Sequence, residues 1–384
     1  MEPLNVQTFK HGNGMKKLRV AVLFGERSGE HDVSLMSARS VLAALDPERY
    51  EVTQVGITLD GEWLHGENTL EAFTSGKFNE LNRAVLPGDP SHSNIYELQI
   101  TNNGEAINKL SEIDVFFPVL HGPFGEDGTL QGLLEMADVA YVGAGVAGSS
   151  VGMDKGIFKD VMRANNIPIV ESILVLRGDI ENNMDGVIEQ VEKMGEYPFF
   201  AKPANLGSSV GISKCTSRSD LAEGLMEAAR YDRRVVVEKG VGNVREVEVS
   251  VLGNEHPETS VCGEVLPSRD FYSYESKYVD GTSGLIIPSQ LPNEVTEKIR
   301  EYAVRAYKAI DCAGMARADF FVESETNKIY LNELNTLPGF TSISMYPKLW
   351  QASGLAYPQL VDRLIELALA RKAQRDHTER RRSA

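Results

Sequence analysis

Two segments near the C-terminus carry charged and amide side chains at every second position. Arg317 and Asp319 alternate with small or apolar residues in the first segment, and Glu333 and Asn335 do so in the second. Side chains two positions apart on a strand share a face, so antiparallel pairing of the segments would bring all four together. Carboxylate and amide oxygens suit Mg²⁺ that also binds substrate phosphates, and an arginine beside them can neutralise a developing anion.

A plainer interpretation of these residues is two polar strand faces joined by an arginine–aspartate bridge. It accounts for Arg317 and Asp319 but leaves Glu333, Asn335 and the following Pro338–Gly339 pair unexplained. We therefore predict a metal site formed by Asp319, Glu333 and Asn335.

Lysines and a loop of small residues occur in the middle of the chain. Lys202 ends a predicted strand at 198–202, and the loop 207–211 (GSSVG) follows it closely. Lysine supplies charge and exposed backbone N–H groups supply donors, so the pattern suits a phosphate. It is not a P-loop, because the lysine precedes the glycines. Lys155, near the start of a predicted helix at 154–165, offers a second cation, although a single lysine there is more often solvated.

Weaker signals lie in three other loops. Glu238 and Lys239 end a predicted strand at 234–239, where backbone groups can read an adenine edge and a carboxylate can bind ribose hydroxyls. Glu30 and His121 follow buried strands of a predicted parallel sheet, at the edge where ligands of such sheets bind. Glu30 is placed to hold an ammonium group, whereas a lone buried histidine is more often a hydrogen-bonded core residue.

A GxGxxG pattern at 143–148 offers a rival interpretation as a dinucleotide-binding dehydrogenase. Glu171 even lies at about the spacing of a ribose-binding acid. However, the preceding strand is short, and Gly152 is expected to interrupt the helix that should follow. We therefore reject this interpretation.

Apolar periodicity predicts an α/β chain that begins with a parallel sheet. The first part, which should end near residue 150, has predicted strands at 18–24, 50–57 and 113–120, helices at 31–45 and 128–137, and a weakly patterned stretch at 60–110. The second part has predicted strands at 169–175, 198–202, 234–239, 245–252, 313–322 and 328–334, helices at 154–165, 181–194, 293–310 and 356–370, and a long loop at 268–284. Such a loop is typical of a lid.

Composition excludes several classes of protein. The net charge of −16 argues against nucleic acid as the partner. No run of about 18 apolar residues predicts a membrane span, and no signal peptide is evident, so we expect a cytoplasmic protein. The three cysteines lack CxxC spacing and are expected to be small core residues. The basic segment 371–382 is expected to be a solvated helix end.

Seven segments together resemble the D-alanine–D-alanine ligases of the ATP-grasp superfamily. They are HGPFGEDGTLQG at 121–132, MDK at 153–155, KPANLGSSVGISK at 202–214, EKGVGNVREVEVSVLG at 238–253, FYSYESKY at 271–278, MARADFF at 315–321 and NELNTLPGFTSISMYP at 332–347. The resemblance implies an N-terminal Rossmann-like domain at 17–150, a central domain at 151–244 and a C-terminal domain at 245–372 with lid loop 268–284. It also implies ATP-dependent ligation of two D-alanines through D-alanyl phosphate, for peptidoglycan precursor synthesis.

The same resemblance implies roles for individual residues. ATP would be bound by Lys155, Lys202, Glu238, Lys239, Val241, Glu246 and Lys277. Two Mg²⁺, for which Mn²⁺ would substitute, would be bound by Asp319, Glu333 and Asn335. The two D-alanines would contact Glu30, His121, Arg317, Gly339, Ser344 and Met345. Catalysis would depend on Glu30, Ser208, Tyr278, Arg317 and Gly339, with Ser208 and Tyr278 linked to Glu30 by hydrogen bonds. The partners would be D-alanine and a second copy of the chain, with no nucleic acid and no membrane.

One position departs from the family pattern, and two rival functions stay open. Glu26 stands where the family often has a second glycine, although Glu30 keeps its place. One rival is a ligase that joins D-alanine to D-lactate, but Tyr278 disfavours it because a neutral tyrosine does not repel an ammonium group. The other rival is a non-catalytic nucleotide-binding regulator, for which the intact set around Arg317 would be unnecessary.

Overall fold

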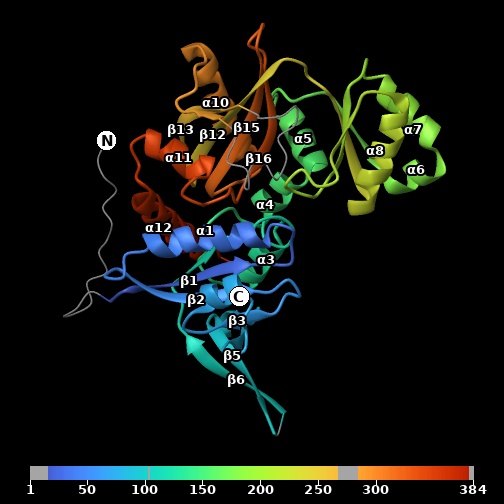
Figure 1. The fold of residues 1–384 in the computed structure, drawn as a ribbon. Coiled ribbons are helices and arrows are strands. Elements are labelled where there is room, and N and C mark those ends of the chain that lie inside the picture. Colours follow the sequence, from blue (N-terminus) through green and yellow to red (C-terminus); the bar gives the residue numbers. More distant parts are fainter. Residues whose placement is uncertain (1–15, 103, 267–283, 380–384) are drawn as a thin grey trace.

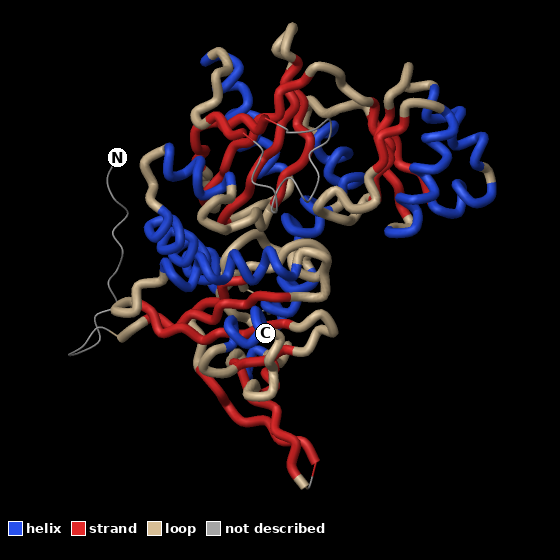
Figure 2. Tube along the Cα trace, in the orientation of Figure 1, coloured by secondary structure: helices blue, strands red, loops and turns tan. Residues whose placement is uncertain are grey.

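A computed structural model describes residues 16–102, 104–266 and 284–379. These residues form three β-sheets with helices packed against them (Figures 1 and 2). The first sheet is at the bottom of Figure 1, the third at the top and the second at the right. In the described part of the chain, no helix is long and apolar enough to cross a membrane.

The first sheet has seven strands in the order β6-β5-β4-β3-β2-β1-β7. Its parallel part consists of β1 (Leu18–Gly25), β2 (Tyr50–Ile57) and β7 (Val115–Pro118), as the apolar runs predict. Its helices are α1 (His31–Ala44), α2 (Thr69–Ser75), the 3₁₀ turn η1 (Pro90–His92) and α3 (Thr129–Met136). The weakly patterned stretch forms antiparallel strands β3 (Trp63–His65), β4 (Asn82–Val85), β5 (Ile95–Thr101) and β6 (Gly104–Ser111). Most of β6 is exposed, which explains why its sequence shows no clear alternation.

The second sheet is a small antiparallel sheet with helices on one face. Its order is β10-β9-β11-β8, formed by β8 (Ser172–Leu176), β9 (Phe199–Pro203), β10 (Ser213–Cys215) and β11 (Arg234–Lys239). The helices are α6 (Arg177–Asn182), α7 (Met184–Glu192) and α8 (Arg218–Tyr231). The single helix predicted at 181–194 is wrong: Asn183 leaves helical geometry and its side chain caps α7 by accepting the Gly186 N–H.

The third sheet is antiparallel and buries one face against helices. Its order is β14-β13-β12-β15-β16, formed by β12 (Val244–Gly253), β13 (Glu258–Leu266), β14 (Gly284–Ile286), β15 (Gly314–Glu323) and β16 (Ile329–Asn335). Helices α5 (Lys155–Ala164) and α10 (Asn293–Ala309) pack against its apolar face. The opposite face carries Glu248, Arg317, Asp319 and Glu333. This sheet thus has one core face and one polar face, as the alternation of β15 predicts.

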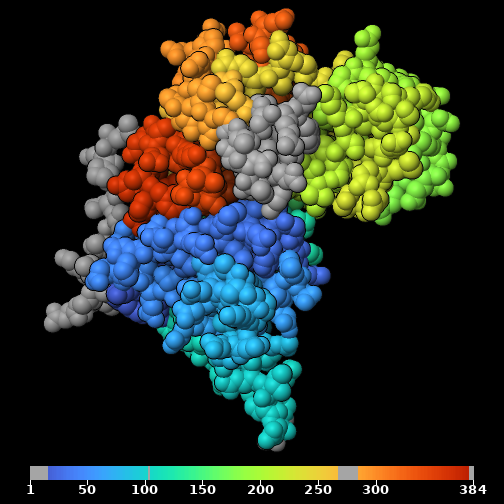
Figure 3. Space-filling view, viewed as in Figure 1, coloured from blue at the N-terminus to red at the C-terminus, as the bar shows by residue number. Residues whose placement is uncertain are grey.

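The C-terminal helices connect the third sheet to the first. Helix α11 (Met345–Ala352) contacts β12 and β13, whereas α12 (Tyr357–Asp376) contacts α1 and β7 as well as β12 and β15. The apolar side chains of α12 belong to the same core cluster as the first sheet. The Tyr50 hydroxyl donates to Asp362 at 2.6 Å, and Arg371 lies over the Tyr141 ring. Figure 3 shows the red C-terminal segment resting on the blue first part. The predicted domain limits at 150 and 244 stay a prediction.

The GxGxxG segment has a packing role in this arrangement. Its last three residues begin α4 (Val146–Met153), which also contains Gly152, so the expected interruption of the helix there is wrong. A Cβ at Gly148 would lie 3.1 Å from Cys312 Cα, and one at Gly152 would lie 2.8 Å from Thr336 Cγ2. These glycines let α4 approach the third sheet closely. The three cysteines are free and buried, which confirms that they are core residues.

Candidate active site

The predicted cluster on β15 and β16 is assembled by strand register. Arg317 pairs with Asn335 and Asp319 pairs with Glu333, which confirms the antiparallel pairing. Arg317 Nε and Nη2 donate to the two Asp319 carboxylate oxygens at 2.7 and 2.6 Å. The Arg317 guanidinium also lies 3.0 Å from Glu248, a buried residue of β12. Sequence reasoning missed Glu248, although the alternation of acids along β12 was the signal for it.

The donor set fits magnesium bound jointly with phosphate. The described residues contain no group of three His, Cys, Asp or Glu side chains that would hold a metal by themselves. Asp319 and Glu333 supply two carboxylates, and Asn335 supplies an amide oxygen that also accepts the Leu337 N–H at 3.0 Å. Mg²⁺ usually takes one or two carboxylates and completes its shell with phosphate oxygens and water. The set is therefore appropriate for an ion that arrives with a nucleotide.

Lys155 lies at the N-terminus of α5, close to the glycine-rich loop. Its ammonium donates to the Leu206 carbonyl at 2.6 Å. Burial lowers the pKa of Lys155, and the Glu333 carboxylate acts in the opposite direction. The N-cap residue Asp154 accepts the N–H groups of Gly156 and Ile157, so the start of this helix is well defined. The structure thus brings Lys155 near one of the predicted metal ligands.

Lys202 and Glu238 form part of a buried ion cluster between β9 and β11. The Lys202 ammonium contacts one Glu238 oxygen at 2.6 Å, and that of Lys159 contacts the other at 2.9 Å. Burial acts to raise the pKa of Glu238, but the two lysines outweigh it and hold the pKa at about 2. Lys159 is 1% exposed and was missed by sequence reasoning, because a lysine within a helix is usually solvated.

The glycine-rich loop reaches the first part of the chain through Ser208. Its hydroxyl donates to the Glu30 carboxylate, which confirms the predicted link between these residues. Ser208 and Ser209 adopt positive φ angles of 51° and 60°, a conformation that is uncommon for serine. Glu30 itself precedes α1, and its N–H donates to Ser28 Oγ at 3.0 Å.

His121 connects the first sheet with the loop after β16. Its Nδ1 lies 3.2 Å from the Leu337 carbonyl and 3.5 Å from Glu126, and its Nε2 lies 3.1 Å from Ser37 Oγ. Burial acts to lower the pKa of His121, but Glu126, with smaller contributions from Glu30 and the Leu337 carbonyl, outweighs it, so the pKa is raised. The Ser37 hydroxyl also accepts the Phe340 N–H, directly after Gly339.

Ser344 and Met345 lie where that loop enters α11. Ser344 is the N-cap residue, and its hydroxyl contacts both the N–H and the hydroxyl of Thr341. Met345 is buried against Val265 and Leu349. Helix N-termini favour negatively charged groups, so this position suits a carboxylate.

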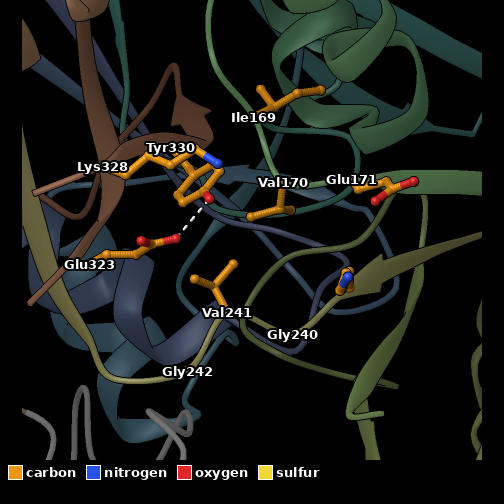
Figure 4. Close-up of a pocket in the computed structure, with 10 residues that line it drawn as sticks. Ile169, Val170, Glu171, Gly240, Val241, Gly242, Glu323, Lys328 and Tyr330 are labelled. Atoms are coloured by element: carbon orange, nitrogen blue, oxygen red, sulfur yellow. Dashed lines mark hydrogen bonds between the residues drawn. The ribbon is translucent and has the colours of Figure 1, made fainter. Parts of the chain in front are cut away.

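A cavity of about 490 Å³ lies between the two segments that join the second and third sheets (Figure 4). On one side of it, the Tyr330 hydroxyl donates to Glu323 at 2.8 Å. The cavity is lined by Ile169, Val170, Glu171, Lys239, Gly240, Val241, Gly242, Glu323, Lys328 and Tyr330. It brings together Lys239 and Val241 of the predicted nucleoside set, whereas Glu238 and Glu246 are not among its lining residues. Lys277, Tyr278 and all but the last residue of the predicted lid 268–284 lie outside the described residues.

Two family models match this chain almost end to end. Residues 19–144 match the N-terminal part of D-Ala–D-Ala ligases, and residues 161–366 match their C-terminal part. This chain belongs to the D-alanine–D-alanine ligase family.

Individual ligases agree with this assignment over nearly their full length. The D-alanine–D-alanine ligase of Natranaerobius thermophilus is 48% identical, with 94% of this chain and 98% of the relative covered. That of Acetivibrio thermocellus is 46% identical, with 92% and 96% covered. Among solved structures, the VanG D-Ala:D-Ser ligase of Enterococcus faecalis has a TM-score of 0.81 at 33% identity. The match covers 92% of this chain and 100% of the ligase chain. The D-alanine–D-alanine ligase of Coxiella burnetii has a TM-score of 0.79 at 34% identity, with 94% and 96% covered.

Family membership decides between the fold interpretations. The mixed α/β architecture is that of an ATP-grasp ligase, and the dehydrogenase interpretation of the GxGxxG segment is excluded. Gly148 of that segment packs against Cys312, just before β15.

Proposed function

We propose that this chain joins two D-alanines into D-alanyl-D-alanine at the expense of ATP, for peptidoglycan precursor synthesis. The observation that carries the proposal is the bond between Ser208 and Glu30. It connects a carboxylate suited to an amino-acid ammonium with the loop beside Lys155, which in turn lies near Glu333 on the polar face of the third sheet. The family is one of ATP-dependent ligases.

The first step activates one D-alanine. Its ammonium binds Glu30, and its carboxylate attacks the γ-phosphate of ATP to give D-alanyl phosphate and ADP. Phosphoryl transfer depends mainly on positioning and charge neutralisation. Lys155 and Lys202 supply positive charge for the phosphates, and Lys202 would exchange its contact with Glu238 for one with phosphate. Two Mg²⁺ held by Asp319, Glu333 and Asn335 would neutralise the remaining phosphate charge.

The second step forms the peptide bond. The amine of the second D-alanine attacks the acyl carbon, and phosphate leaves from the tetrahedral intermediate. Arg317 and the Gly339 N–H stabilise its oxyanion, because preformed donors act where charge develops. Arg317 is held for this role by Asp319 and Glu248. The carboxylate of the second D-alanine binds Ser344 and the N-terminus of α11, next to Met345.

The nucleoside would bind at the two segments that join the second and third sheets. Lys239 and Val241 line the cavity there, and Glu246 lies on β12 close by. Glu238 would contribute through the charge that its two lysines maintain. We further propose a cytoplasmic homodimer, in which the lid 268–284 with Lys277 and Tyr278 completes the site.

An ADP-release assay tests the proposal against its rivals. The purified chain is given ATP and Mg²⁺ with D-alanine alone, or with D-alanine plus D-lactate or D-serine, and the products are identified by mass spectrometry. We expect D-alanyl-D-alanine to dominate. Preference for D-lactate or D-serine would make the chain a ligase of different specificity. Nucleotide binding without any ADP release would favour the non-catalytic regulator.

A further inference from the structure

Glu26 is a buried acid in an unusual backbone conformation. It follows β1 with φ at +115°, a region that favours glycine, and it is 2% exposed. Both features are unfavourable, since the backbone is strained and a carboxyl group loses its hydration. Among the described residues, no lysine, arginine or histidine forms an ion pair with it. Its retention in this position therefore needs a compensating contact.

The compensating contact is with the backbone of His121. The His121 N–H donates to the two Glu26 carboxyl oxygens at 2.6 and 2.8 Å. The His121 carbonyl accepts from Ser28 Oγ at 2.8 Å. Both backbone groups of His121 are thus held by the segment 25–30, which also carries Glu30. The space around the carboxyl is close-packed, since a Cβ at Gly125 would lie 2.8 Å from Glu26 Oε2.

The backbone of Glu26 is anchored on both sides. Its N–H donates to the Ile57 carbonyl at 2.7 Å, and its carbonyl lies 2.9 Å from His31 Nδ1 in the first turn of α1. These two contacts fix the position of the Glu26 backbone and hence the starting point of its side chain. Because the His121 ring reaches the Leu337 carbonyl two residues before Gly339, a displacement of His121 would be transmitted to that loop.

We propose that Glu26 is a positioning residue for the first D-alanine. Its carboxyl accepts the His121 N–H and so fixes the segment 120–126 against the segment that carries Glu30. This inference rests on the proposed substrate site around Glu30.

The charges around Glu26 explain why the neutral form is the useful one. Burial, together with the nearby Glu126 and Glu30, raises the pKa of Glu26 to about 10. An ionised Glu26 would add negative charge beside Glu126, whose own pKa burial raises. A neutral Glu26 still accepts the His121 N–H, and it adds no negative charge beside Glu126.

Two substitutions separate the acceptor role of Glu26 from its effect on the fold. Glu26→Gly suits the positive φ but removes the carboxyl, whereas Glu26→Gln keeps the shape and a carbonyl acceptor without a titratable group. The experiment measures kcat, the two Michaelis constants for D-alanine, the KM for ATP and the thermal unfolding temperature. Glu30→Gln serves as the reference for loss of the first D-alanine.

We expect Glu26→Gly to raise the KM for the first D-alanine about 10-fold or more, since a small displacement of the groups that position a substrate strongly reduces catalytic efficiency. The KM for ATP should stay within about 2-fold of native, because the nucleotide residues lie on other sheets. The unfolding temperature should change little, since relief of the backbone strain opposes the loss of the acceptor for the buried His121 N–H. Glu26→Gln should stay within about 3-fold of native in every constant, because the His121 N–H keeps its acceptor.

Native D-alanine constants in Glu26→Gly would overturn the inference. So would a Glu26→Gln enzyme as impaired as Glu26→Gly, since the ionised carboxylate would then be the working form. If Glu30→Gln impairs the first D-alanine while Glu26→Gly does not, the substrate site stands and only the role of Glu26 fails. Unchanged constants in Glu30→Gln would overturn the site and the inference together.

Discussion

At the scale of single residues, the oxygen donors on β15 and β16 carry the first prediction. Glu333→Gln removes one of two carboxylates from a set that must bind a cation together with phosphate. We expect ligation to be abolished and the unfolding temperature to stay near native, because the isosteric amide preserves the strand pairing. ADP release is measured at saturating Mg²⁺, with Glu325→Gln in the exposed turn before β16 as the control. Turnover close to native would remove Glu333 from the metal site.

Arg317 is fixed in advance by two carboxylates, which leads to the second prediction. Because its guanidinium contacts Asp319 and Glu248, it needs no reorganisation when an oxyanion forms. We expect Arg317→Ala to lower kcat by about 10²–10³, with a much smaller change in the KM for ATP. The control is Arg245→Ala, since Arg245 pairs with Glu264 on neighbouring strands of the same sheet. A change confined to KM would mean that Arg317 binds only the ground state.

Lys159 carries the third prediction, because it shares Glu238 with Lys202. Lys159→Met would leave Glu238 to Lys202 alone, so that Lys202 is held more firmly away from phosphate. We expect the KM for ATP to rise about 10-fold, a cost of ~1.4 kcal/mol, with D-alanine constants near native. Initial rates at varied ATP provide the measurement, and an unchanged KM would argue against the exchange of partners by Lys202.

The ion cluster also predicts how stability depends on pH. The pKa of Glu238 is lowered from 4.5 to about 2 in the folded state. The ionised side chain is therefore more stable in the folded protein than in the unfolded chain. This contribution to the free energy of unfolding is fully present above pH 4.5 and is lost as the pH falls toward 2. Urea unfolding across that range should show a shallower decline in Glu238→Gln than in the native protein.

At the scale of elements, α12 carries the fifth prediction. Leu364 is fully buried in the core shared by α12 and the first sheet. Leu364→Ala should lower the free energy of unfolding by about 2–5 kcal/mol through lost burial and the cavity left behind. The half-exposed Leu174 of β8 offers a matched control, and its alanine variant should change stability by less than about 1 kcal/mol. Equal losses in the two variants would contradict the docking of α12 on the first sheet.

At the scale of the whole molecule, the bond between Ser208 and Glu30 connects the second sheet to the first. Ser208→Ala removes this contact without disturbing either core. We expect kcat to fall and the KM for the first D-alanine to rise, each by about 10-fold, because the two loops lose their mutual alignment. The unfolding temperature should stay near native, and Ser219→Ala on α8 is the matched exposed control. Native kinetics in Ser208→Ala would show that the loops align without this bond.

Local periodicity in the sequence was sufficient for the core strands and for the cluster around Arg317. The alternation of polar and apolar residues is a property of neighbours, so the facing of Arg317 and Asp319, and of Glu333 and Asn335, follows from the strands themselves. The motif segments were likewise sufficient to indicate the ligase family. The same reasoning failed for β3 to β6, because the exposed strand β6 offers no alternation to detect.

The contacts that depend on the path of the chain were decided only by the tertiary structure. Lys159 and Lys202 meet at Glu238 because α5 and β9 both pass beside β11, and nothing in the local pattern of any of these residues predicts a buried ion pair. In the sequence, Glu26 is only a departure from the family pattern. In the folded chain, its carboxyl accepts the backbone N–H of His121. Periodicity reports which face a residue takes on its own element, whereas burial and pairing across distant segments arise only when the elements pack together.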